Sequence, residues 1–275
     1  MTQLSRQEFS LLSGFTKQFT GIELTEDKEY LIEHRFGPLL EKYQVGSYQE
    51  LYARSLLNDL VKQSMIDAIC TNETLFFRDQ NPFKALTQEI LPNLFARGEN
   101  KIIRIHSAAC STGQEAYSIC IAAKEAGFDL DRVFVYGSDI SEIALGKARE
   151  GIYSSFELTR GMDERLRDKY FTPAGVNFQL NEDIRRKVSF ESRNLLTEQP
   201  PSTSLDLVFC RYVACYFDLT TKQKLFNTIA DNMSDGGYLI VGASEYLEGV
   251  TNRFKIAPSA IGKYYQLTTA DSALH

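Results

Sequence analysis

Two carboxylates, Glu115 and Asp139, lie close behind apolar runs of the sequence, where a nucleoside could bind. Glu115 follows a stretch of mostly small residues, 108–114, that joins the apolar run 102–105 to an amphipathic helix. Asp139 follows the next apolar run, 133–136. A strand, a small-residue turn and a helix N-terminus form a nucleotide-type site at the carboxyl edge of an α/β sheet. We therefore expect both carboxylates at one edge of such a sheet.

The turn before Glu115 indicates which nucleoside it suits. It contains one glycine, Gly113, and not the three of a dinucleotide-binding turn. Glu115 itself stands where a pyrophosphate would need bare amide donors. Adenosine without a diphosphate therefore fits better than NAD. Asp139 is placed to accept hydrogen bonds from ribose hydroxyls, and Glu115 to pair with an ammonium group, so the two carboxylates together favour S-adenosylmethionine. A small-residue turn alone would be weak evidence, because such turns occur in any α/β domain.

A second segment whose residues could bind a ligand or take part in catalysis is 71–79. It surrounds Arg78 with polar residues and with Phe76 and Phe77. It lies where the texture of the sequence changes from helical to alternating, and ligand sites often form at such domain junctions. The plainer alternative is a capped linker whose two phenylalanines dock the domains. Both interpretations stay open at the level of sequence.

Residues 194–196 and 209–218 form a third group, because each segment follows a predicted strand and so belongs to the same carboxyl edge. The second segment contains Arg211, Tyr212 and Tyr216. The alternative is core packing, with the arginine tied to a helix end. Short matches of this kind have a high false-positive rate when taken singly.

The elements that must position these residues follow from hydrophobic spacing. Apolar residues at helical spacing predict helices over 6–19, 26–43 and 59–69, with another beginning at Ser47. Pro38 should kink or break the second of them. From Lys101 onward, strands and helices alternate, which predicts a mainly parallel, doubly wound sheet. We predict a helical N-terminal domain over 1–75, a linker over 76–98, an α/β domain over 99–268 with an insertion at about 153–187, and a tail over 269–275.

Composition narrows the class of protein. The 275 residues are 43% hydrophobic and 24% charged, with a net charge of −6, so a large nucleic-acid surface is not expected. No run approaches the ~18 apolar residues of a membrane span, and no apolar signal core opens the chain. Five cysteines without a CxxC pair argue against a disulfide framework or a metal site. We expect a cytoplasmic monomer without a structural metal.

In order and spacing, these motifs resemble the CheR-type chemotaxis receptor glutamate methyltransferases. The residues that carry the resemblance lie in 71–78, 107–115, 138–140, 194–196 and 209–218. The resemblance implies an S-adenosylmethionine-dependent, Rossmann-like methyltransferase domain behind an all-α domain. It assigns cofactor contacts to Asn72, Thr74, Arg78, Glu115, Asp139, Asn194, Leu195, Arg211 and Tyr212. It also places Arg78 and Tyr216 beside the transferable methyl group.

The implied activity is that of a protein-glutamate O-methyltransferase, which forms glutamate methyl esters on the cytoplasmic coiled coils of methyl-accepting chemotaxis receptors. An ionised glutamate attacks a sulfonium methyl directly, so alignment and removal of water matter more than a general base. We expect Arg78 to hold the carboxylate and the Tyr216 hydroxyl to position it or to screen the sulfonium. Phe76 and Phe77 could line an apolar pocket there.

Receptor docking is suggested by Lys28, Arg35 and Lys42, which recur every seven residues. On a continuous helix they would form one cationic stripe, able to meet acidic helices of a receptor. The alternative is a solvated face, since Glu29, Glu33 and Glu41 alternate with the cations.

The chain departs from the family pattern at two positions. Tyr212 replaces a usual asparagine, and Ala116 replaces a common proline. The Tyr212 ring could stack near the adenine or crowd the site. One alternative is therefore a non-catalytic adaptor that binds S-adenosylmethionine or S-adenosylhomocysteine. A small-molecule O-methyltransferase is another, on the fold alone. A nucleic-acid base methyltransferase is disfavoured, because the sequence lacks the motif of that class and the chain is acidic.

In some members of the family, the insertion grips a peptide at the receptor C-terminus. Here the stretch 171–184 is short and contains only Gly175 as a glycine. Peptide capture by strand addition needs an accessible edge and a loop that can close over it. We therefore predict methylation without such a tether.

Overall fold

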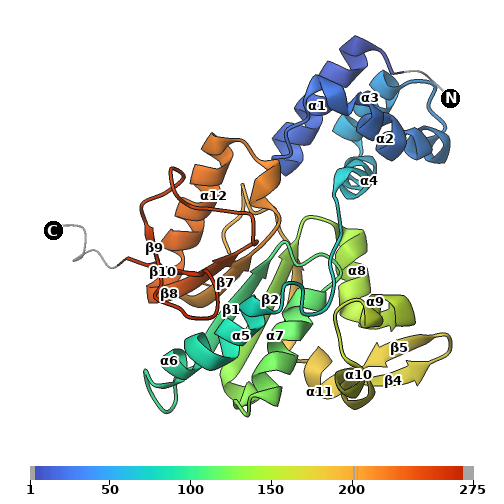
Figure 1. Ribbon diagram of the computed structural model, residues 1–275. Helices are drawn as coiled ribbons and strands as arrows, with labels where there is room; N and C mark the ends of the chain where they lie inside the picture. Colours follow the sequence, from blue (N-terminus) through green and yellow to red (C-terminus); the bar gives the residue numbers. More distant parts are fainter. Residues whose placement is uncertain (1–3, 201, 203, 269–275) are drawn as a thin grey trace.

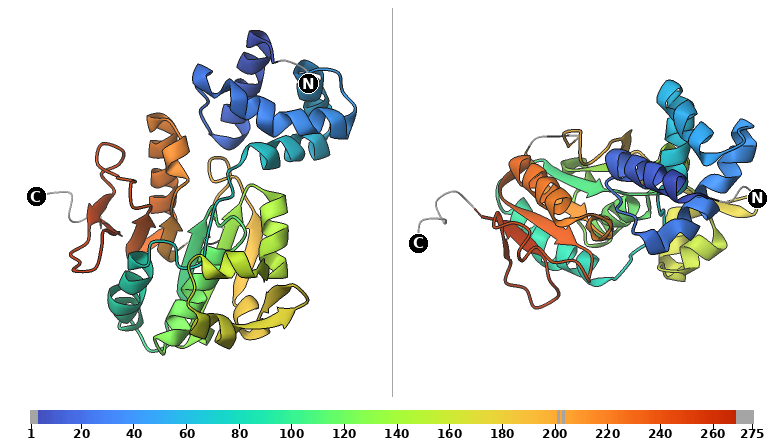
Figure 2. Two further views of the ribbon diagram at one scale, coloured as in Figure 1. Left: turned by 45° about the vertical axis from the view of Figure 1, so that its right-hand side comes forward. Right: turned by 90° about the horizontal axis from the view of Figure 1, so that it is seen from above.

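The computed structural model describes residues 4–200, 202 and 204–268, so the expected tail, 269–275, lies outside the described residues. The chain forms a helical N-terminal domain, an α/β domain and a small β-subdomain inserted into the latter (Figure 1). Figure 2 shows the N-terminal helices standing at one end of the α/β domain. No helix among the residues described is long and apolar enough to cross a membrane.

The N-terminal domain has the four helices that the spacing predicted. Ser5, Ser47 and Asn58 cap three of them by accepting backbone N–H groups, and Leu12, Phe15, Ile32, Phe36 and Leu51 lie in their shared core. The helices are α1 (Arg6–Thr20), α2 (Glu29–Tyr43), α3 (Tyr48–Leu57) and α4 (Asp59–Ile69).

Helix α2 corrects the prediction of a break at Pro38. It continues through Pro38 to Tyr43. The proline ring is exposed, and the apolar residues on the opposite face stay packed in the core, which offsets the helical hydrogen bond that Pro38 cannot donate. Lys28 lies before the helix, in the 3-10 turn Glu26–Lys28, so the expected cationic stripe does not run along one continuous helix.

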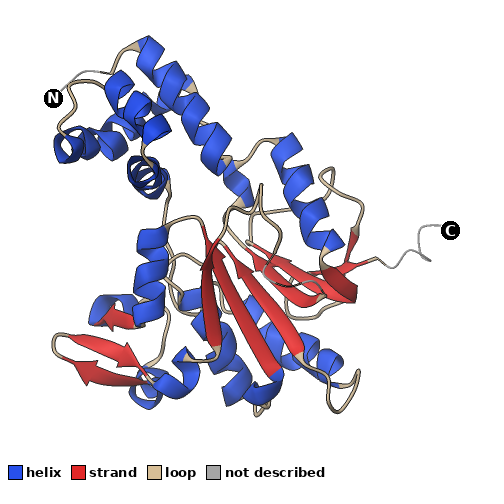
Figure 3. Cartoon of the chain, turned by 180° about the vertical axis from the view of Figure 1, so that it is seen from behind, coloured by secondary structure: helices blue, strands red, loops and turns tan. Residues whose placement is uncertain are grey.

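A seven-stranded, mostly parallel sheet organises the α/β domain, as predicted (Figure 3). The first five strands in spatial order pair in parallel, and the last two pairings of the sheet are antiparallel. In that order the strands are β6 (Val188–Ser192), β2 (Val133–Asp139), β1 (Ile103–Ala108), β7 (Leu205–Cys210), β8 (Met233–Val241), β10 (Tyr265–Leu267) and β9 (Phe254–Ile256).

Alternating side chains of the strands pack into two separate cores. Leu207 and Phe209 of β7 face the core beneath α7 (Gln114–Glu125), whereas Val208 and Cys210 face the core beneath α12 (Leu219–Asp231). Helix α8 (Glu142–Glu150) follows β2 and packs beside β6. Helices on both faces make the sheet doubly wound.

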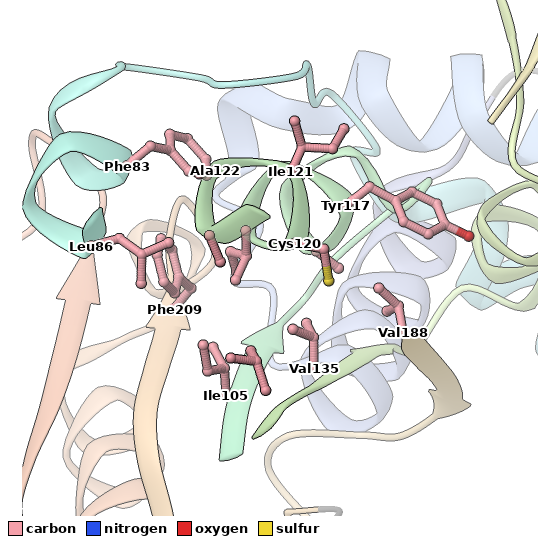
Figure 4. Packing of buried hydrophobic residues seen from close by; sticks show 14 of the residues in the cluster. Phe83, Leu86, Ile105, Tyr117, Cys120, Ile121, Ala122, Val135, Val188 and Phe209 are labelled. Atoms are coloured by element: carbon pink, nitrogen blue, oxygen red, sulfur yellow. The ribbon is translucent and has the colours of Figure 1, made fainter. Parts of the chain in front are cut away.

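Residues 76–98, which we expected to be a linker, are instead largely helical and contribute buried apolar side chains to the core of the α/β domain. They contain α5 (Asn81–Ala85), the π-helical turn Leu86–Ile90 and α6 (Leu91–Phe95). Phe83 and Leu86 point at α7 and at Phe209 of β7, and the rings of Phe83 and Phe209 stack with centroids 6.0 Å apart (Figure 4). The surface that stabilises this segment comes from distant parts of the chain, so local periodicity did not indicate it.

The insertion between α8 and β6 is a three-stranded antiparallel sheet with short helices. Its strands are β3 (Ile152–Ser154), β4 (Phe171–Ala174) and β5 (Asn177–Leu180), in the order β3-β5-β4, and its helices are α9 (Ser155–Thr159), α10 (Glu164–Tyr170) and α11 (Glu182–Arg185). Glu125 of α7 anchors it, because this carboxylate accepts hydrogen bonds from Arg165 and Tyr170, both at 2.7 Å.

Candidate functional site

Three central strands end together and so bring the predicted site residues to one edge. Ala108, the last residue of β1, pairs with Ser138 of β2 on one side and with Cys210 of β7 on the other. The segments that follow, beginning at Ala109 and Arg211, therefore leave the sheet side by side. This is the edge at which ligands bind in open α/β folds.

The turn after β1 has a strained backbone. Ala109 and Ser111 have positive φ angles of 60° and 51°, which L-residues rarely adopt, and Gly113 has a φ of 91°. Two hydrogen bonds hold the turn: the Ser111 N–H donates to Asp139 at 2.8 Å, and the Ser111 hydroxyl donates to the carbonyl of Asn72 at 3.0 Å. The turn is thus tied to both neighbouring site segments.

Asp139 is buried, and its carboxylate is held by the backbone. One oxygen accepts from Ser111 N–H, and the other accepts from Ser141 N–H at 2.9 Å. Burial raises the pKa of Asp139 above its ordinary value, although these N–H groups oppose the shift. A carboxylate has about four lone-pair sites, so the two oxygens can still accept hydrogen bonds from a ligand.

A small cavity of about 50 Å³ brings Asp139 together with two other predicted residues, Asn194 and Leu195. Thr20, from the end of α1, closes it, and the amide of Asn194 donates to the carbonyl of Phe19 at 2.8 Å. The acceptors and apolar walls suit a nucleoside. The volume holds a water or two, so it accommodates only part of a nucleoside.

A buried ionic cluster lies beside this cavity. The Arg211 side chain is 1% exposed and bridges Glu115, at 2.9 Å, and Asp79, at 2.6 Å. Ser107 donates to the other oxygen of Glu115 at 2.7 Å. Two carboxylates against one guanidinium leave a formal charge of −1, which suits a cationic ligand group. The Nε of Arg211 has no partner in the described part of the chain.

Arg78 and Tyr212 form an adjacent pair. The guanidinium carbon of Arg78 lies 3.7 Å from the centroid of the Tyr212 ring, and Arg78 also donates to the carbonyl of Glu73 at 3.1 Å. Tyr212 has a φ of 58°, and its hydroxyl bonds to Asp79. Within residues 4–200, 202 and 204–268, Arg78 forms no ion pair with a carboxylate.

The side chains of two other predicted residues, Tyr216 and Thr74, take part in none of the contacts described above. The Tyr216 side chain is 41% exposed, its carbonyl accepts from Glu23 N–H at 3.1 Å, and its hydroxyl has no hydrogen-bond partner in the described ranges. Thr74 is half-buried.

Phe76 and Phe77 pack within the α/β domain and its insertion, and not in the core of the helical domain as the docking alternative would require. Phe76 is fully buried between Tyr153 and Phe171 of the insertion, with ring centroids at 5.0 and 5.5 Å, and Phe77 packs on Phe83 at 5.3 Å. Phe76 is therefore enclosed and cannot line a reactive pocket, whereas for the half-buried Phe77 this stays a prediction.

Sequence reasoning missed two acidic residues, Asp79 and Glu245. Asp79 joins Arg211 to Tyr212, as described above. Glu245 is buried and accepts the backbone N–H groups of Tyr212, Cys215 and Gly242 at 2.8 to 3.0 Å, which ties the segment after β7 to the end of β8. Glu245 lies a few residues after the end of β8, and Asp139 is the last residue of β2. A carboxylate close to the end of a strand was therefore the signal in the sequence that could have identified Glu245.

The three predicted docking cations occupy different surroundings. Lys42 is exposed and donates to the Ser64 hydroxyl at 3.1 Å, whereas Lys28 lies 3.5 Å from Asp27. Arg35 is half-buried and points at the last carbonyls of α4, with long contacts of 3.4 and 3.5 Å to Ala68 and Cys70. Arg35 is therefore partly committed to the fold.

Comparison with known proteins agrees with this geometry. Residues 72–262 match the family model for the SAM-binding domain of CheR methyltransferases, and residues 7–70 match that for their all-alpha domain. The chain is 35% identical to a chemotaxis protein methyltransferase of Vibrio parahaemolyticus, over 96% of this chain and 98% of the relative. It is 33% identical to the chemotaxis protein methyltransferase Cher2 of Pseudomonas putida, over 94% and 97%. A Borreliella burgdorferi chemotaxis protein methyltransferase shares 34% identity, over 94% and 95%.

Proposed function

Because this chain belongs to the CheR methyltransferase family, we propose that it transfers a methyl group from S-adenosylmethionine to glutamate side chains of chemotaxis receptors. The family establishes a methyltransferase with an S-adenosylmethionine-binding domain. The glutamate substrate, the ester product and the cytoplasmic helices of the receptor as the docking partner are the proposed part.

The observation that carries the proposal is the state of Arg78. Arg211 is already paired with Asp79 and Glu115, whereas Arg78 contacts a ring face and a backbone carbonyl. A guanidinium without a carboxylate partner, beside the cofactor-binding turn, can hold a substrate carboxylate in a bidentate pair. Arg78 is the residue that we assign to this task.

The reaction needs alignment and no proton transfer. When bound, S-adenosylmethionine supplies a methyl group activated by a positive sulfonium. A glutamate oxygen forms the new C–O bond as the S–CH₃ bond breaks, and S-adenosylhomocysteine and the methyl ester are the products. Arg78 orients the carboxylate, and the Tyr216 hydroxyl completes its placement from the segment after β7. Holding the two reactants in line can supply a large part of the rate enhancement of a bimolecular transfer.

The cofactor contacts that we propose form three groups along the carboxyl edge. Asp139, Asn194 and Leu195 bind the nucleoside, with Asp139 accepting from the ribose hydroxyls. Glu115 and Arg211 meet the amino-acid end, where the charge of −1 on the ionic cluster favours the ammonium group. The remaining contacts come from Asn72, Thr74 and Arg78, whereas the side chain of Tyr212 contacts Arg78 and Asp79.

Receptor docking is proposed for the cations of the N-terminal domain. Lys28 and Lys42 would bind acidic side chains of the receptor helices. Arg35, which is half-buried against α4, would contribute through the exposed part of its guanidinium. Electrostatic complementarity of this kind speeds encounter and sets orientation more than it adds affinity.

Transfer of a labelled methyl group to purified receptor tests the function. The protein should label receptor that has its methylatable glutamates and should not label receptor in which these are alanine. Calorimetry with S-adenosylhomocysteine measures binding separately. Binding without transfer to any receptor would favour the adaptor.

Substitutions test the assigned roles. Arg78→Ala should lower turnover on the order of 100-fold through misplacement of the carboxylate, with a smaller effect on cofactor affinity, and Tyr216→Phe should also lower turnover. Arg253→Ala is the matched control, because Arg253 forms a surface pair with Asp231 at the far end of α12. Turnover equal to wild type in both the Arg78 and Tyr216 variants would refute these roles.

A further inference from the structure

We propose, building on the function proposed above, that Tyr212 is a positioning residue: its ring is a platform that orients the Arg78 guanidinium for the substrate carboxylate. The guanidinium carbon lies 3.7 Å from the ring centroid, which is close enough for a strong cation–π contact. The Arg78 side chain has one other polar contact in the described ranges, its hydrogen bond to the Glu73 carbonyl. The ring therefore supplies most of what restricts this side chain.

The platform is itself held from three sides. The backbone of Tyr212 adopts a left-handed φ of 58°, and its N–H donates to the buried Glu245 at 2.8 Å. Its hydroxyl bonds to Asp79, which is fixed in turn by Arg211 at 2.6 Å. A strained residue persists only where its surroundings over-determine it, and such residues concentrate at functional sites.

A glycine makes room for the ring. A Cβ atom placed on Gly242 at the end of β8 would lie 3.0 Å from two ring atoms of Tyr212 and 2.8 Å from Glu245. A larger residue at Gly242 would thus displace either the ring or the carboxylate that holds its backbone. The position of the ring is therefore set by the segments that follow β7 and β8.

These contacts favour a platform over direct stacking of Tyr212 on adenine. One ring face is covered by Arg78, and the guanidinium of Arg211 lies 5.3 Å from the ring centroid. Asp139 and Asn194, the proposed nucleoside contacts, line a cavity whose walls do not include Tyr212. The ring instead joins the ionic cluster to Arg78.

A double-substitution cycle tests the catalytic role. Tyr212→Leu should lower turnover about 2- to 30-fold, the range of one cation–π contact, and leave the affinity for S-adenosylhomocysteine nearly unchanged. In an Arg78→Ala background, the same change should have little effect on turnover. Tyr212→Phe, which keeps the ring, should retain most of the activity. Phe95→Leu is the matched control, because it removes a ring 4.4 Å from Arg132 at the opposite edge of the sheet.

Two outcomes of the cycle would overturn the role. Equal losses with and without Arg78 would mean that Tyr212 acts through the general fold. A loss of cofactor affinity that is independent of Arg78 would mean that Tyr212 contacts the cofactor directly.

Nuclear magnetic resonance of the arginine Nε–H group tests the geometry without any need for activity. A guanidinium over a ring face should have an upfield-shifted resonance, and Arg78→Lys assigns that resonance by removing it. The shift should persist in Tyr212→Phe and vanish in Tyr212→Leu. An unshifted resonance in the wild-type protein would overturn the platform. If the wild-type protein transferred no methyl group, the proposed function would fail, while this resonance would still decide whether the ring holds Arg78.

Discussion

Replacing Asp139 separates its role in folding from its role in cofactor binding. Its two oxygens accept buried N–H groups of Ser111 and Ser141, at 2.8 and 2.9 Å. Asp139→Ala would leave both donors unpaired, at about 1–3 kcal/mol each, which is a large share of a typical unfolding free energy. Asp139→Asn keeps one acceptor and the shape of the side chain, so it should cost roughly half as much.

The asparagine variant is therefore the informative one for binding. It replaces a charged acceptor for the ribose hydroxyls by a neutral one, a difference of about 1–1.5 kcal/mol, so the Kd for S-adenosylhomocysteine should rise roughly 5- to 13-fold. Calorimetry gives the Kd, and thermal unfolding of the free protein shows how much structure is lost. Asp168→Asn, on the exposed face of α10, is the control.

The pH dependence of the wild-type protein provides a second measurement. Because the pKa of Asp139 is raised in the folded protein, its contribution to stability decreases as pH rises through the interval above its ordinary 3.8. Ribose hydroxyls favour the ionised form, so cofactor affinity should instead increase with pH over the same interval. The Asn variant should lack both trends. A Kd for this variant within twofold of wild type, in folded protein, would place Asp139 outside the cofactor site.

Four further outcomes are expected. Glu125→Gln should lower the unfolding temperature by a constant amount above pH 4.5 and by less as pH falls toward about 2, because hydrogen bonds from the insertion lower the pKa of Glu125 to about 2; a difference independent of pH would contradict this. Gly21→Ala should destabilise by about 1 kcal/mol or more, since Gly21 has a φ of 76° and a Cβ would lie 2.3 Å from Leu196, whereas Gly14→Ala, in open space within α1, should not; equal unfolding temperatures would argue against the strain. Lys42→Glu should raise the KM for receptor at low salt and spare the Kd for cofactor, and an unchanged KM would eliminate this cation from docking. The C-terminal pentapeptide of tethered receptors should not bind the insertion, whose β4 and β5 are joined by a two-residue turn; micromolar binding by calorimetry would show that the hairpin edge accepts it.

Local sequence was enough for the elements whose residues interact with near neighbours. Apolar spacing and capping residues placed α1, α3 and α4 to within a few residues, because helix formation depends on contacts three and four positions apart. The strands β1, β2 and β7 stood out as apolar runs, and parallel order brought Glu115, Asp139 and Arg211 to one edge. The family followed from motifs at these strand ends, and the matches over 7–70 and 72–262 confirm it.

Tertiary structure decided what depends on partners distant in sequence. The helices over 81–95 form because α7 and β7 provide an apolar surface, and Phe76 is buried because the insertion closes over it. The contact between Arg78 and Tyr212 joins the segment before α5 to the segment after β7. The orientation of Tyr212 is set by Asp79, Glu245 and the space at Gly242. Local spacing has no information about a hydrogen bond or a ring contact between segments more than a hundred residues apart, because such contacts exist only after the sheet has brought its carboxyl ends together.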